Sequence, residues 1–85
     1  MEGERLKLRV RYFASIREWT RLREEEVDLP DGSTAEALKW EVQRRHKLEN
    51  PEETILVAVN GGFVEPTRIL RQGDEVALFP PVSGG

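Results

Sequence analysis

Residues 6–12, Leu6-Lys7-Leu8-Arg9-Val10-Arg11-Tyr12, alternate apolar and charged side chains with a period of two. Successive side chains of a β-strand point to opposite faces of a sheet, so the four apolar residues share one face. The segment therefore predicts a half-buried first strand whose charged side chains lie on the opposite, wet face.

The next residues predict a short helical turn and a second strand. The alternation ends at Phe13-Ala14, and residues 15–20 place Ile16 and Trp19 three positions apart. Residues 22–29 then read as a half-buried strand that ends at Pro30-Asp31-Gly32. Its three consecutive glutamates, Glu24 to Glu26, are interpreted as the solvated edge of a sheet.

A helix is expected after this strand. Ser33 and Thr34 both suit an N-cap, and Glu36 lies three residues after Ser33, as a capping box requires. The apolar positions form one stripe, which covers one side of a sheet: Ala35, Leu38 and Val42, with Ala37 or Trp40 at the margin. The helix is expected to fade near His46-Lys47, before a stop at Asn50-Pro51. His46, the single histidine, is interpreted as a solvated helix cap and not as a metal or catalytic group.

The second half of the chain predicts three more strands. Residues 55–59 are a continuous apolar run, typical of a central or nearly central strand. Asn60-Gly61 is a strong hairpin signal, with the chain returning through Phe63-Val64. Pro66 limits the residues after it to an edge or a loop, and a second turn at residues 71–74 precedes a last strand that ends at Phe79.

This order of elements predicts an α+β fold of the β-grasp, or ubiquitin-like, type. It is a mixed sheet of about five strands with one main helix packed across it, and connection rules allow the first and last strands to lie side by side at its centre. We expect one domain over residues 1–79 and a flexible tail over residues 80–85.

Length, charge and composition limit the classes of function open to this chain. The 85 residues suit one small domain, and a net charge of −3 disfavours nucleic acid as a partner. The chain has no cysteine, so any sulfur it handles must come from elsewhere. It also has no run of about 18 apolar residues, so no membrane span is expected and the cytoplasm is the default location.

The tail, Phe79-Pro80-Pro81-Val82-Ser83-Gly84-Gly85, carries the chemistry that the rest of the chain lacks. Two prolines cannot continue a central strand and favour an extended chain, which reaches roughly 20 Å over six residues. Glycines pass through narrow channels because they lack a Cβ. A terminal carboxylate can attack the α-phosphate of ATP to give an acyl adenylate, which then accepts a sulfur, nitrogen or oxygen nucleophile.

Six segments together resemble the MoaD-type small subunit of molybdopterin synthase, a ubiquitin-like sulfur carrier. They are Val10-Arg11-Tyr12-Phe13-Ala14 with Arg17-Glu18, Asp31-Gly32-Ser33-Thr34, Val59-Asn60-Gly61, Gly73-Asp74-Glu75-Val76 and the terminal heptad. The terminal heptad, at its distance from the others, is the most specific of them. Trp19-Thr20-Arg21 stands where the family often has a small-residue turn.

The resemblance implies a reaction cycle for Gly85. A ubiquitin-activating-type (MoeB-type) partner adenylates the Gly85 carboxylate with ATP, and a sulfur donor converts it to a thiocarboxylate. The tail then enters the large (MoaE-type) synthase subunit and gives its sulfur to cyclic pyranopterin monophosphate. Gly84 is the clearance residue in that channel. Alone, the chain is expected to catalyse nothing and to bind no cofactor or metal, because ATP belongs to the activating partner.

Partner binding is expected around the tail. Its residues Pro80, Pro81, Val82, Ser83 and Gly84 contact the partner on this reading, and Phe63, Phe79 and Phe13 are candidate anchors because aromatic residues dominate interfaces. Core packing explains Phe63 and Phe79 about equally well, and Phe13 better. Arg9, Arg11 and Arg17 belong either to an anion-binding or partner-facing patch or, more simply, to the wet face of the sheet.

Three other functions stay open at this point. Gly85 is also compatible with a ubiquitin-like modifier joined to lysines, since the same adenylate serves both fates. A sulfur carrier for thiamine, cysteine or transfer-RNA thiolation, or a non-covalent interaction module, would also have this fold.

Overall fold

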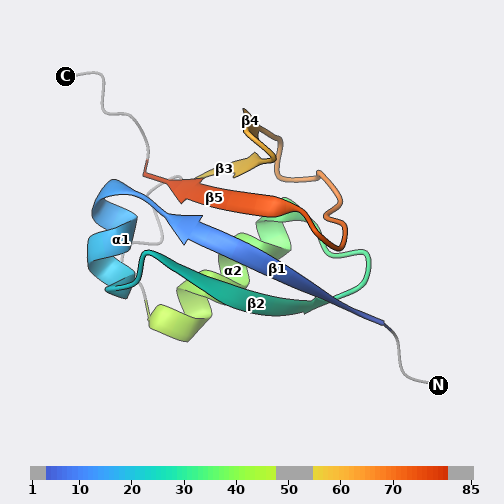
Figure 1. The fold of residues 1–85 in the computed structure, drawn as a ribbon, viewed down its shortest axis with the longest axis horizontal. Helices are drawn as coiled ribbons and strands as arrows, with labels where there is room; N and C mark the ends of the chain where they lie inside the picture. Colours follow the sequence, from blue (N-terminus) through green and yellow to red (C-terminus); the bar gives the residue numbers. More distant parts are fainter. Residues whose placement is uncertain (1–3, 48–54, 81–85) are drawn as a thin grey trace.

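The computed structural model describes residues 4–47 and 55–80. Its elements are β1 (Arg5–Tyr12), α1 (Ala14–Thr20), β2 (Glu24–Pro30), α2 (Ala35–His46), β3 (Leu56–Val59), β4 (Gly62–Phe63) and β5 (Glu75–Phe79). The five strands form one mixed sheet in the order β2-β1-β5-β3-β4. Figure 1 shows α2 crossing one face of this sheet and α1 at the end of the sheet where β1 and β5 finish. The predicted β-grasp fold is confirmed.

The first and last strands pair at the centre, as expected. β1 and β5 run parallel, with Val10 beside Val76 and Tyr12 beside Leu78. β2 flanks β1 and β3 flanks β5, both antiparallel. The predicted edge position of β2 and the nearly central position of β3 are therefore confirmed. Both strands start later than predicted: β2 begins at Glu24, after the exposed Leu22, and β3 begins at Leu56, after Ile55.

The core lies between α2 and the facing side of the sheet. Every second residue of β1 is buried, as its alternation predicts. The core also takes in Ile16 from α1 and Leu70 from the loop before β5, together with the predicted helix stripe Ala35, Leu38 and Val42. Trp40 instead lies outside the core at 58% exposure, so the stripe is narrower than its margin suggested.

The start of α2 corrects the predicted capping box. Thr34 is the N-cap, and its Oγ1 accepts a hydrogen bond from the Ala37 amide at 3.2 Å. The Ser33 hydroxyl donates instead to the Pro30 carbonyl, and the Glu36 carboxylate accepts from the indole of Trp40. The helix ends at His46, as expected, and Lys47 in the left-handed region follows it. The predicted stop at Asn50-Pro51 lies outside the described residues.

Candidate functional site

The sheet face opposite α2 carries a row of side chains that crosses all five strands. The strand registers align, from β4 to β2, Phe63, Ala58, Ala77, Arg11 and Glu24. The two alanines occupy the middle of this row, between larger neighbours. The sheet surface is therefore low at its centre and high at its margins.

Three aromatic rings stand around that low centre. The Phe79 ring stacks on the Phe13 ring, with centroids 4.6 Å apart and planes within 4°, and meets the Phe63 ring edge-on at 5.4 Å. The Phe13 amide donates to the Leu78 carbonyl at 3.2 Å, which holds Phe13 beside β5. We call this hollow of about 280 Å³ the aromatic groove; its walls are Phe13, Phe63 and Phe79, and its floor is Ala58 and Ala77.

The aromatic rings of the groove are available to a partner. Phe63 is 66% exposed and Phe13 is 37% exposed, and Phe79 is half-buried against them. None of the three belongs to the core, so the packing alternative for these residues is wrong. An exposed cluster of large aromatic side chains is the usual composition of an interface centre.

A hairpin fixes the position of Phe63. Asn60 and Gly61 both have positive φ, at 52° and 90°, as the predicted tight turn requires. The Asn60 side chain accepts from the Glu75 amide and donates to the Asp74 carboxylate, each at 3.0 Å. The turn that presents Phe63 is thereby tied to the start of β5.

The groove lies at the base of the predicted tail. β5 ends at Phe79, and Pro80 follows it at the edge of the described chain. Pro81, Val82, Ser83, Gly84 and Gly85, which carry the predicted chemistry, lie outside the described residues. The structure thus brings Phe63 and Phe79 together, with Pro80 next to Phe79 in the chain, and the assignments of the last five residues stay predictions.

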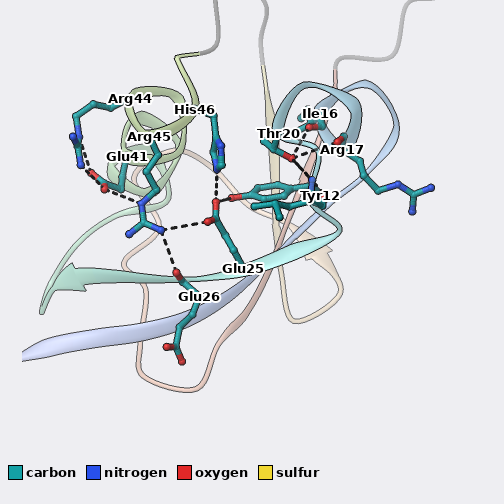
Figure 2. Close-up of polar contacts among 11 residues, drawn as sticks. Tyr12, Ile16, Arg17, Thr20, Glu25, Glu26, Glu41, Arg44, Arg45 and His46 are labelled. Atoms are coloured by element: carbon teal, nitrogen blue, oxygen red, sulfur yellow. Dashed lines mark hydrogen bonds and ion pairs between the residues drawn. The ribbon is translucent and has the colours of Figure 1, made fainter.

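Glu25 and His46 correct two interpretations made from the sequence. Glu25 lies on the inner side of β2, with 17% of its side chain exposed, and is not a solvated edge residue. Its Oε2 accepts from the Tyr12 hydroxyl and from His46 Nε2, each at 2.5 Å, and Arg45 reaches its other oxygen at 3.4 Å (Figure 2). His46 is half-buried in this cluster and is not a solvated cap.

The cluster shifts the pKa of two of its members. Burial alone would raise the pKa of Glu25, but hydrogen bonds from His46 and Tyr12 and the nearby charges of His46 and Arg45 hold it below its usual value. Burial, followed by the bond to Glu25, raises the pKa of Tyr12. These contacts favour the ionised form of Glu25 and join the end of α2 to β1 and β2, away from the aromatic groove.

The described part of the chain contains no group of three or more His, Cys, Asp or Glu side chains able to hold a metal ion. No helix among the described residues is long and apolar enough to cross a membrane.

The groove floor is the feature that the sequence interpretation missed. Ala58 and Ala77 each lie between two large apolar residues, in Val57-Ala58-Val59 and Val76-Ala77-Leu78. The larger neighbours point into the core, so each alanine points to the other face. A lone small residue at an outward position of a predicted central strand was the available signal.

Comparison with known proteins decides the family. Residues 10–85 match the model of the ThiS family. The chain belongs to the ThiS family. A molybdopterin synthase sulfur carrier subunit from Chlamydomonas reinhardtii is 36% identical over 83 residues, which cover 94% of this chain and all of that protein. The resemblance to the small subunits of molybdopterin synthase is therefore confirmed.

Solved structures extend the similarity to the whole fold of this ThiS-family protein. A putative molybdopterin converting factor, subunit 1, from Pyrococcus furiosus is 36% identical, with a TM-score of 0.81 over 91% of this chain and 99% of that one. Small archaeal modifier protein 1 of Haloferax volcanii is 26% identical, with a TM-score of 0.78 over 91% and 99%. The chain is thus a ubiquitin-like protein of the sulfur carrier type.

Proposed function

We propose that this ThiS-family protein is the sulfur carrier subunit of a molybdopterin synthase and that Gly85 is its reacting end. The observation that carries the proposal is the position of the aromatic groove. One wall of the groove is Phe79, the last strand residue before the segment that ends in Gly84-Gly85. A partner that binds the groove holds the chain six residues before its terminus.

The proposed chemistry has three steps at the Gly85 carboxylate. An oxygen of the carboxylate attacks the α-phosphate of ATP on a MoeB-type enzyme, which forms the acyl adenylate and releases pyrophosphate. Sulfide delivered by a sulfur donor attacks the acyl carbon and displaces AMP, which leaves a thiocarboxylate and releases a proton. The thiocarboxylate sulfur then bonds to a carbon of cyclic pyranopterin monophosphate as a carbon–oxygen bond at that carbon breaks, and water hydrolyses the acyl–sulfur bond, which leaves the sulfur on the product and restores the carboxylate.

The groove supplies the binding energy for these encounters. Its volume of about 280 Å³ suits one or two apolar side chains from the partner, which would contact the Phe63 and Phe79 rings above the alanine floor. When a partner binds the groove, the reaction of the tail becomes an effectively unimolecular step, which is the main rate advantage available to a flexible reactive end. The large MoaE-type subunit then provides the acid and base groups and the substrate pocket.

A reconstituted synthase tests the proposal. The chain, a MoeB-type enzyme, a sulfur donor, ATP and a MoaE-type subunit are combined with cyclic pyranopterin monophosphate, and molybdopterin is measured. A chain without Gly85, and one extended by a single alanine after Gly85, should give no product while their thermal unfolding stays unchanged. Full activity of the extended chain, with the added residue still attached, would contradict the proposal.

The similarity to small archaeal modifier protein 1 favours one second candidate function, covalent attachment of Gly85 to lysines of other proteins. In this case the adenylate is captured by an amine instead of a sulfur. Expression of a tagged chain in its own organism separates the two, because a modifier gives a ladder of isopeptide-linked products and a carrier gives none.

A further inference from the structure

A second hollow adjoins the aromatic groove, and it is lined by arginines. It has a volume of about 390 Å³, and we call it the arginine pocket after Arg11 of β1, Arg17 of α1 and Arg23 of the turn before β2. Arg11 and Phe13 line both hollows, so the aromatic groove and the arginine pocket form one continuous surface.

Backbone hydrogen bonds hold the arginine positions in place. The Tyr12 amide donates to the Arg23 carbonyl at 2.8 Å, which fixes Arg23 beside β1. The Arg21 amide donates to the Arg17 carbonyl at 2.8 Å and closes α1. The buried Thr20 hydroxyl donates to the Ile16 carbonyl at 3.0 Å within α1 (Figure 2). The buried Ile16 side chain anchors this short helix to the core.

The arginine pocket carries more positive charge than its surroundings neutralise. Arg11 lies 3.7 Å from Glu24, an exposed pair that contributes little. Within residues 4–47 and 55–80, neither Arg17 nor Arg23 has an ion-pair partner within 4.0 Å. Two guanidinium groups are therefore unpaired in this part of a chain whose net charge is −3.

We infer that the arginine pocket binds carboxylate side chains on the same partner protein that binds the aromatic groove. The partner surface would present an apolar side chain to the groove and, beside it, an acidic rim to Arg17 and Arg23. Guanidinium groups suit this role because their planar forks pair with carboxylates in a bidentate manner. The inference rests on the proposed function, since it names the chemistry of the docking partner.

The charges on the same face favour a protein partner over a nucleic acid. The outward positions of β1 and β2 form a ladder in which Lys7 faces Asp28, Arg9 faces Glu26 and Arg11 faces Glu24, and Glu75 lies on the other side of Arg9. A phosphate backbone that crossed this face would meet these carboxylates. A folded protein can place two or three carboxylates at the arginine pocket and fill the apolar groove at the same time.

The inferred contact predicts electrostatic steering. Complementary charges at the rim of an interface raise the association rate constant and orient the encounter, and salt weakens both effects. Because the arginine pocket lies on one side of the groove, the pairing would also select the direction in which the tail enters its partner.

Association kinetics with the MoaE-type subunit at about 20 mM and about 500 mM salt test the inference. We expect Arg17→Glu and Arg23→Glu each to lower the association rate constant severalfold at low salt, and the double variant to lower it about tenfold. At high salt the variants and the wild type should converge. Thermal unfolding confirms that the exposed substitutions leave the fold intact.

Two matched controls carry the same change of charge. Arg21→Glu lies between the two test sites but does not line the arginine pocket, and Arg71→Glu lies in the turn before β5. Both should reduce the rate far less than Arg17→Glu.

Equal effects at Arg17, Arg21 and Arg71, or no effect at any of them, would overturn the inference. So would saturable binding of an RNA of about 20 nucleotides that is lost in the Arg17 and Arg23 variants while the association with the subunit is unchanged. A wild-type chain that does not associate with the subunit at all would contradict the proposed function itself.

Discussion

Replacing Phe63 by alanine should separate binding from folding. Phe63 is 66% exposed, and its ring meets the Phe79 ring edge-to-face, with ring centroids 5.4 Å apart. An aromatic pair contributes about 0.5 to 1.5 kcal/mol, so the free energy of unfolding should fall by about 1 kcal/mol. The thermal midpoint should then drop by no more than about 4 to 8 °C.

The effect on docking should be larger. A phenylalanine side chain presents about 200 Å², and two thirds of this, about 130 Å², is available to a partner at 66% exposure. At about 25 cal/mol per Å², complete burial is worth about 3 kcal/mol. Alanine keeps its Cβ and burial is rarely complete, so we expect a loss of about 2 kcal/mol, or about a 30-fold weaker Kd.

Titration calorimetry with the MoaE-type subunit at one salt concentration measures this loss. The matched control is Trp40→Ala, which removes an aromatic side chain of 58% exposure from α2, on the opposite side of the sheet. Its Kd should equal that of the wild type. The reasoning is refuted if Phe63→Ala binds within twofold of the wild type, or if Trp40→Ala weakens binding as much.

The remaining predictions concern stability. Glu25→Ala leaves the Tyr12 hydroxyl buried without its partner, so the free energy of unfolding should fall by about 2 kcal/mol and the thermal midpoint by about 8 to 16 °C. The control Glu24→Ala should change the midpoint by under about 3 °C. Similar losses of stability for the two variants in urea unfolding would contradict a stabilising role of the Glu25 contacts. Because the pKa of Glu25 is lowered in the folded protein, its contribution is present above the unfolded value of 4.5 and is lost as the pH falls below it. Glu25→Gln should therefore flatten the acid limb of stability against pH, and an unchanged limb would contradict this. Asn60→Ala should lower the free energy of unfolding by about 2 to 3 kcal/mol, because it loses two hydrogen bonds and places alanine at a positive φ. Asn60→Gly should recover about 1 kcal/mol of this, because glycine adopts a positive φ without strain. Equal losses of stability for the two variants would exclude a contribution from strain.

Local patterns were sufficient to predict the fold because each agrees with the global arrangement. The alternation in β1 matches its burial at every position, and the run over residues 55–59 reads as a strand that has neighbours on both sides. Asn60-Gly61 has the two positive φ values that its composition favours. Each of these signals lies within one element, where a sequence period reports directly on one face of the chain.

The polar cluster and the groove depend on contacts between elements, which no local period reports. Glu25 looks identical to Glu24 and Glu26 in the sequence, and only the pairing of β2 with β1 and the end of α2 places its carboxylate between Tyr12 and His46. Ala58 and Ala77 become one floor only because β3 and β5 pair in that register.

The intact mass of the protein tests the central claim most directly. After incubation with a MoeB-type enzyme, ATP and a sulfur donor, the chain should gain about 16 Da, because one oxygen of the Gly85 carboxylate is replaced by sulfur. Fragmentation should place the gain on Gly85. An unchanged mass, in a mixture that charges a known sulfur carrier, or a gain elsewhere in the chain would contradict the account.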